Sequence, residues 1–218
     1  LCQSAMERTA CAVADFYHEG QKENAHVLAF ATAAVRSAAN GGDFCALVRQ
    51  MCGLNVDVIS GEEEALLGLS GALGHSDGGM IDIGGASTEI CIRRGGEIVF
   101  SVSLPIGAVR ILEQCGQDPR KIRAFVEDAL HPLHGICGPA QMYAIGGTAS
   151  TLASIRLGLS EYDAKKLNGL SLPRDWLSEI SGRLLSLPVE ERKKIPGMDL
   201  RRADVIAGAA VLLSAAVE

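Results

Sequence analysis

The sequence has few aromatic residues, no excess of basic charge and no long apolar run. Aromatics make up 4% of the 218 residues, 48% of the residues are hydrophobic, and the formal net charge is -6. These values exclude a basic nucleic-acid-binding arm and a disordered tail. No apolar stretch approaches the ~20 residues that span a bilayer, and no secretory leader pattern follows Leu1. We therefore expect a globular cytoplasmic protein that binds neither nucleic acid nor membrane.

The seven cysteines include no C-x-x-C pair. An odd number without paired spacing indicates reduced thiols and a cytosolic protein. His131, His134 and Cys137 are spaced three residues apart and are a conceivable metal-ligand set. Pro132 and Gly135 are expected to interrupt any helix that would align them. A helix end running into a loop is therefore favoured over a metal site.

Apolar periodicity predicts alternating helices and strands in the first part of the chain. Ser4 and Glu7 have capping-box spacing and open a helix that is expected to stop at Gly20. The further predicted segments are strands at 27–31 and 56–59, and helices running to residue 39, over 43–52 and over 62–73. This alternation is typical of an α/β layer with a buried, largely parallel sheet.

The glycine-rich and polar stretch at residues 74–79 predicts a domain boundary, with domains over 1–75 and 76–218. The second domain opens with an antiparallel meander. The predicted segments are strands at 80–83, 87–92, 98–104 and 142–145, and helices at 108–115, 119–133, 147–157 and 203–217.

Two glycine-rich turns have the composition of phosphate sites. In residues 82–89 (DIGGASTE), Asp82 and Glu89 suit a Mg²⁺ ion, while the backbone N–H groups between them suit a phosphate. The alternative is a plain hairpin with a solvated aspartate. In residues 144–150 (AIGGTAS), the turn leads into a helix whose N-terminus attracts anions. Tight strand-to-helix packing explains that second turn equally well.

The ordered motifs resemble one family, the exopolyphosphatase and guanosine pentaphosphate phosphohydrolase (Ppx/GppA) family of the actin-like, sugar-kinase-like phosphotransferase superfamily. The segments that carry the resemblance are residues 31–36 (ATAAVR), 58–65 (VISGEEEA), 82–89 (DIGGASTE), 103–110 (SLPIGAVR), 146–149 (GGTA), and 196–197 with 202–204 (PG and RAD). Together they cover nearly the whole chain, and their common order makes the resemblance specific.

The resemblance implies a Mg²⁺-dependent (or other divalent-cation-dependent) hydrolase that releases terminal phosphate from polyphosphate or guanosine pentaphosphate by water attack in an interlobe cleft. Glu64 would activate the water, with Glu63 as the alternative, and Arg36 would neutralise phosphoryl charge. Asp82 and Glu89 would hold the metal. The implied phosphate-binding residues are Gly84, Gly85, Ala86, Ser87, Thr88, Gly146, Gly147 and Thr148.

The implied fold is a two-lobed actin-like (ribonuclease H-like) ATPase α/β fold with mixed sheets flanked by helices. The first lobe, 1–75, is expected to lack its opening strands and first phosphate loop, and the last helix, 203–217, to pack back at the lobe junction. Because Leu1 is not methionine, the natural start is expected upstream. Ala86 replaces the third glycine of the family loop, which an ordinary negative φ tolerates.

Two other functions stay open. One is a non-catalytic sensor of guanosine tetraphosphate or pentaphosphate, and the other is an ATP-dependent kinase or activator ATPase of the same superfamily. A basic cluster at Arg192, Lys193, Lys194, Arg201 and Arg202 is either a solvated helix face or a track for a phosphate chain. The oligomeric state is also open, with a homodimer as one alternative.

Overall fold

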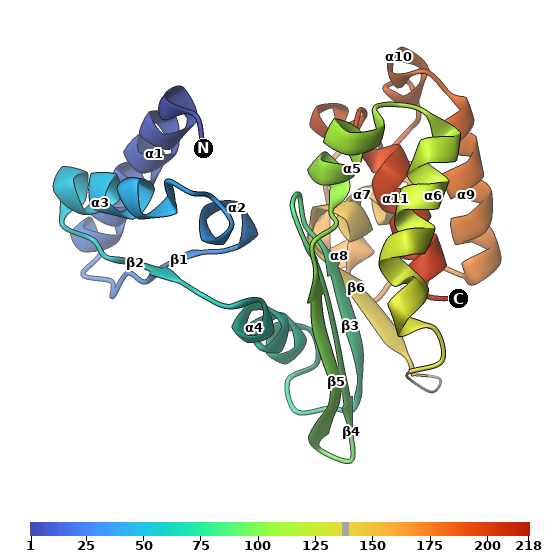
Figure 1. Cartoon of the computed structure of the whole chain (residues 1–218), viewed down its shortest axis with the longest axis horizontal. Coiled ribbons are helices and arrows are strands. Elements are labelled where there is room, and N and C mark those ends of the chain that lie inside the picture. Colours follow the sequence, from blue (N-terminus) through green and yellow to red (C-terminus); the bar gives the residue numbers. More distant parts are fainter. Residues whose placement is uncertain (137–139) are drawn as a thin grey trace. The chain divides into compact units, whose positions relative to one another are not determined.

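The computed structural model describes residues 1–136 and 140–218, which form two compact units, Leu1–Glu64 and Ala65–Glu218. The chain passes from one unit to the other within helix α4 (Gly61–Leu73; Figure 1). The composition break predicts the boundary later, at 75/76. The difference arises because Ala65 and Leu69 are completely buried together with Met80 of the second unit, so most of α4 belongs to that unit.

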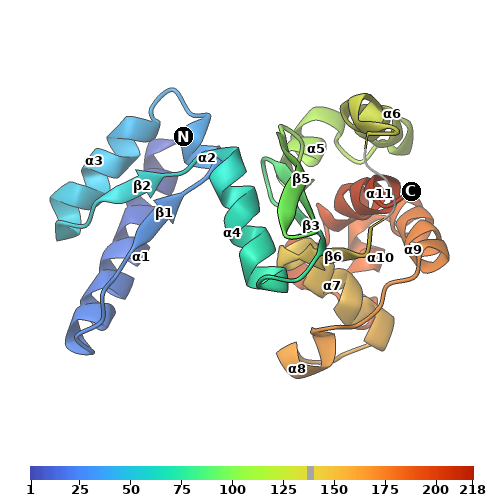
Figure 2. The ribbon, with the colours of Figure 1, turned by 90° about the horizontal axis from the view of Figure 1, so that it is seen from below.

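The first unit is a short parallel strand pair backed by helices. Its elements are α1 (Gln3–Lys22), β1 (Ala29–Ala31), α2 (Ala33–Arg36), α3 (Gly41–Cys52) and β2 (Val56–Val58). Figures 1 and 2 show α1 and α3 on the same side of the strands, where Met6, Ala10, Phe44 and Val48 form the core. Parallel pairing of β1 with β2 confirms the predicted strand direction.

The predicted ends of the first helix are wrong by one to two residues. The helix begins at Gln3 rather than after Ser4, because the N–H groups of Ala5 and Met6 already donate to the Cys2 carbonyl. The side chain of Glu7 accepts from Gln3 Nε2 at 2.8 Å and caps nothing. The helix also continues beyond Gly20, to Lys22, since glycine inside a helix costs only about 1 kcal/mol.

The second unit contains a four-stranded mixed sheet in the order β5-β4-β3-β6. Its strands are β3 (Gly78–Ile83), β4 (Thr88–Arg94), β5 (Glu97–Leu104) and β6 (Met142–Ile145). The first three form the predicted antiparallel meander, and β6 lies parallel to β3. The carboxyl ends of β3 and β6 therefore meet at one edge, directly beside the turn that joins β3 to β4.

Helix α11 (Ile206–Ala216) is the centre of the second unit. Nearly all of its residues are buried, as expected for a helix that is apolar all round. It packs against α5 (Ala108–Cys115), α6 (Pro119–Leu130), α7 (Gly146–Leu157) and α9 (Arg174–Ser186), and Figure 1 shows it among them in red. The expected packing of this helix at the lobe junction stays a prediction.

The remaining helical segments are short. They are the 3₁₀ turns η1 (His131–Leu133) and η2 (Leu200–Arg202), and the helices α8 (Ala164–Leu167) and α10 (Val189–Arg192). Within the described ranges, no helix combines the length and the apolar character that crossing a bilayer requires.

A close backbone contact fastens the β3–β4 turn to helix α5. The N–H groups of Ala108 and Val109 donate to the carbonyls of Gly84 and Gly85, both at 2.9 Å. Gly107 lies so near this turn that a Cβ would stand 2.6 Å from the Gly85 carbonyl carbon and oxygen. Only a residue without a side chain fits that position.

The Gly107→Ala variant is expected to lower the free energy of unfolding by about 1–3 kcal/mol, the usual cost of overpacking. Gly182→Ala in α9 is the matched control, because a Cβ there meets nothing within 4 Å and alanine is the better helix former by about 1 kcal/mol. Urea unfolding followed by circular dichroism measures both. Equal stability of Gly107→Ala and the parent chain would disprove the steric constraint.

Asp118 caps α6 and is expected to make stability sensitive to acid. Its carboxylate accepts from the N–H groups of Lys121 and Arg120, and these hydrogen bonds lower its pKa. A carboxyl whose folded pKa is depressed stabilises fully above its unfolded pKa, and this contribution is lost as pH falls through the folded pKa. Asp118→Asn keeps an acceptor without the titration, so its stability should fall less between pH 7 and about pH 3.

Candidate functional site

In the first unit, an arginine and a glutamate meet beyond the carboxyl ends of β1 and β2. Arg36 ends α2, which follows β1, and Glu64 lies in the first turn of α4, which follows β2. Parallel strands bring such segments to the same edge. Arg36 Nη1 donates to Glu64 Oε2 at 3.2 Å and to the Ile59 carbonyl at 2.8 Å. Both side chains remain about a quarter exposed, so the Glu64 carboxylate is held in place and still reaches water.

Glu63 has a different role from Glu64. Its carboxylate accepts from the Ser60 N–H at 2.7 Å, and its own N–H donates to Ser60 Oγ at 3.1 Å. This is a capping box at the start of α4, and the bond from the Ser60 backbone lowers the pKa of Glu63. The S-x-x-E spacing of Ser60 and Glu63 in the sequence is typical of such a box. The Glu63 side chain therefore caps the N-terminus of α4.

In the second unit, Asp82 and Glu89 lie directly opposite each other on β3 and β4. Opposed residues of an antiparallel pair point to the same face, so the two carboxylates lie side by side. Glu89 is 2% exposed and accepts from Ser103 Oγ at 2.7 Å. Two neighbouring carboxylates repel each other, and a cation relieves that repulsion. Because carboxylate oxygens are also the ligands that Mg²⁺ prefers, these residues fit a divalent cation.

The β3–β4 turn uses part of its hydrogen-bonding capacity to hold itself together. The Gly84 N–H donates to the Ser87 carbonyl at 3.0 Å, and the Gly84 and Gly85 carbonyls accept from α5. The N–H groups of Gly85 and Ala86 take part in no such backbone bond among the described residues, and Gly85 is exposed. Ser87 is buried. The turn therefore offers backbone donors at its tip.

Two hydroxyls that we expected to bind phosphate are instead directed at the backbone. Thr88 Oγ1 donates to the Ile106 carbonyl at 2.7 Å, and Thr148 Oγ1 donates to the Ile83 carbonyl at 3.1 Å. Both threonines are almost completely buried. Since a hydroxyl has a single proton to donate, neither hydroxyl is a free donor for a phosphate in this conformation. Thr88 links the start of β4 to the segment before α5, and Thr148 links α7 to the end of β3.

The second glycine turn brings α7 close to the acidic pair. Gly146 has φ +77, and a Cβ there would overlap Asp82 Oδ1. At Gly147, a Cβ would overlap the guanidinium of Arg202. The first N–H groups of α7 have no partners within the helix, and no side chain caps this end. A carboxylate, a guanidinium and a helix N-terminus thus surround one glycine pair.

The sequence places Arg202 in the basic cluster, but it does not link this residue to the second glycine turn. Arg202 closes the η2 turn, its side chain is 39% exposed, and its Nε lies 3.8 Å from Asp199 Oδ2. The segment that contains Arg202 contributed to the family resemblance, but nothing in the linear pattern connects it with Gly147. Tertiary folding alone brings a cation to the start of α7.

The rest of the predicted basic cluster is neutralised or buried. Lys193 and Lys194 pair with Glu190 and Glu191, and Arg201 pairs with Asp199. Arg192 is 1% exposed, and its guanidinium donates to the Leu184 and Ala203 carbonyls and to Gln117 Oε1; burial lowers its pKa. This pattern favours a structural segment over a phosphate-chain track.

Comparisons with known proteins agree with these observations. The chain is 30% identical over 239 residues to "Exopolyphosphatase 2" of Mycobacterium tuberculosis, a match that covers 96% of this chain and 72% of the relative. It is 45% identical over 92 residues to the guanosine-5'-triphosphate,3'-diphosphate pyrophosphatase of Vibrio cholerae, covering 40% of this chain and 18% of that protein.

Solved structures and a family model match nearly the whole chain. The crystal structure of the Aquifex aeolicus Ppx/GppA family member superposes with a TM-score of 0.80 at 29% identity, covering 98% of this chain and 74% of that one. This likeness confirms the predicted actin-like α/β fold class. The model of the Ppx/GppA phosphatase family matches residues 1–218. The chain therefore belongs to the Ppx/GppA phosphatase family.

Proposed function

We propose that this protein is a divalent-cation-dependent phosphohydrolase that releases terminal phosphate from inorganic polyphosphate or guanosine pentaphosphate. The observation that carries the proposal is the Arg36–Glu64 pair, which holds one carboxylate partly open to water while Glu63 caps the helix. Relatives named as an exopolyphosphatase and as a guanosine pentaphosphate pyrophosphatase support the two substrates.

In the proposed reaction, Glu64 orients a water molecule and accepts one of its protons. The water oxygen forms a bond to the terminal phosphorus as the bridging P–O bond breaks, and the shortened phosphate chain leaves. Arg36 positions Glu64 through Nη1, and its other N–H groups are suited to the phosphoryl oxygens.

The second unit supplies groups for the negative charge of the substrate. Asp82 and Glu89 would hold the divalent cation, which when bound spreads the charge that develops on the phosphoryl oxygens. The N–H groups at Gly85 and Ala86 and the start of α7 are donors suited to phosphate. We add Arg202 to this set, because its guanidinium lies against Gly147.

The Glu64→Gln variant is expected to lower kcat by about 10²–10⁴-fold, the usual contribution of a general base. Glu63→Gln is the matched control, because glutamine also serves in a capping box, and it should retain kcat within a few fold. Phosphate release from polyphosphate and from guanosine pentaphosphate, measured for each variant, tests both substrates at once.

Full activity of Glu64→Gln on both substrates would refute the assignment of the base. If the parent chain binds guanosine tetraphosphate or pentaphosphate calorimetrically and releases no phosphate from either substrate, the protein is a sensor. Transfer of phosphate from ATP to an acceptor other than water would instead identify a kinase.

The Asp82→Asn variant is expected to raise the Mg²⁺ concentration for half-maximal activity at least tenfold, because one of two anionic ligands is lost. Glu97→Gln, an exposed carboxylate on β5, is the control and should leave that concentration unchanged. A Mg²⁺ titration of phosphate release measures both. Identical titrations for Asp82→Asn and the parent would exclude Asp82 as a ligand.

A further inference from the structure

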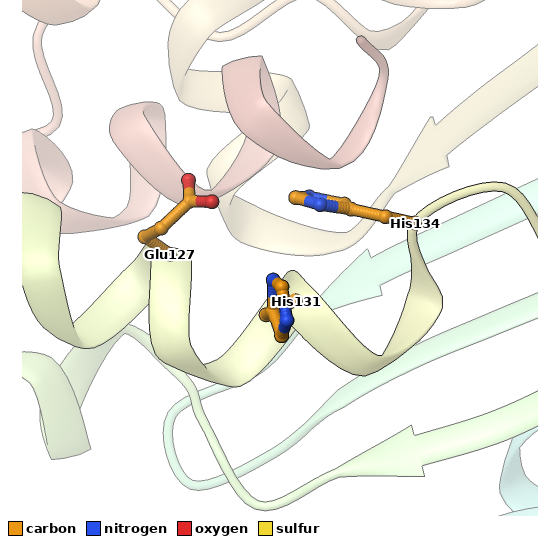
Figure 3. Close-up of side chains that lie close together, drawn as sticks. All are labelled: Glu127, His131 and His134. Atoms are coloured by element: carbon orange, nitrogen blue, oxygen red, sulfur yellow. The ribbon is translucent and has the colours of Figure 1, made fainter.

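A glutamate and two histidines converge on the outer face of the second unit, at the end of α6. Glu127 is in α6, His131 begins η1, and His134 directly follows it. One potential ligand atom from each side chain lies within 4.8 Å of those of the other two. The two imidazole rings meet edge to face with centroids 5.5 Å apart. Figure 3 shows the carboxylate and both rings gathered on one side of the helix end.

The helical spacing explains this convergence. Residues four and three positions apart share a helix face, and η1 continues that face beyond the last turn of α6. The opposite face is buried through Ile122, Val126 and Leu130, which fixes the helix against the core. The three candidate ligand side chains are exposed, whereas the opposite face of α6 is buried.

As the sequence predicts, the α-helix ends before Pro132, at Leu130, and the 3₁₀ turn that follows still brings the two histidines together. Pro132 occupies an early position of the 3₁₀ turn, where a missing N–H costs no hydrogen bond. The His134 N–H still donates to the His131 carbonyl at 3.2 Å, so the turn closes around the proline. Cys137, the third member of the set considered from sequence, lies outside the described residues.

The chemical surroundings favour a cation. All three residues are exposed, and in the described part of the chain none of their side chains forms a hydrogen bond or ion pair that would compete with a ligand role. The last carbonyl groups of α6 add partial negative charge at the same end of the helix.

We propose that Glu127, His131 and His134 form a transition-metal site that binds Zn²⁺, with water completing the coordination. Two imidazoles and one carboxylate are a borderline-soft donor set that suits Zn²⁺ better than Mg²⁺. The set differs in chemistry from the all-carboxylate pair of Asp82 and Glu89. It needs neither the hydrolase activity nor the first unit, and a bound ion would tie the η1 turn to α6.

Isothermal calorimetry of the full chain with ZnCl₂ tests the proposal. Because exposed Cys2 and Cys11 also attract zinc, the parent for all measurements carries Cys2→Ser and Cys11→Ser. We expect one tight Zn²⁺ per chain, with affinity at least tenfold lower in His131→Gln, His134→Gln and Glu127→Gln. His75 is also exposed but is distant in sequence from the proposed site. His75→Gln is therefore the matched control and should bind Zn²⁺ like the parent.

Two further readouts make the outcome decisive. Zn²⁺ should raise the Tm of the parent but not of the His131→Gln/His134→Gln double variant, and a millimolar excess of Mg²⁺ should not displace it. Circular dichroism checks that each variant folds. We expect all of them to fold, because the substituted side chains are exposed. Superimposable Zn²⁺ titrations of the parent and the double variant, or the absence of Zn²⁺ binding by the parent, would overturn the proposal.

Discussion

The second unit depends on the close approach of three glycine backbones. Gly107 packs against Gly84 and Gly85 without room for a side chain, and the first amides of α5 donate to the carbonyls of the turn. This contact fixes the end of the β3–β4 hairpin, so Asp82 and Glu89 remain in register beside it. The carboxylate pair is thus placed by packing in which neither carboxylate takes part.

Neighbouring residues of one motif have different roles, some structural and some proposed to be chemical. Glu63 caps α4 while Glu64, the next residue, faces Arg36. The hydroxyls of Thr88 and Thr148 donate to backbone carbonyls, which leaves backbone N–H groups and Arg202 as the donors near the glycine turns. Some polar residues of the glycine-rich motifs therefore stabilise the fold and are not free donors for a ligand. The reason is that buried polar groups need hydrogen-bond partners within the protein.

Local patterns predicted most of the elements. The meander, the strand at 142–145 and the helix after Gly146–Gly147 follow from alternation, helical periodicity and turn residues, all of which act over a few positions. The errors also have local causes. The Ser4–Glu7 spacing predicts a capping box at a place where the helix has already begun, whereas the same spacing at Ser60–Glu63 forms one. Pro132 ends the α-helix as predicted, but it lies within a 3₁₀ turn that begins at His131 and that the pattern does not predict.

By itself, the sequence determined the α/β character, the order of the family motifs and the identity of the acidic and glycine-rich candidates, because these depend on residue type and spacing. Only the tertiary structure decided which candidates meet. It set Arg36 beside Glu64 and Arg202 against Gly147, and it paired or buried the rest of the basic cluster. Distances between side chains on different elements depend on how those elements pack, and a linear pattern carries no record of that packing.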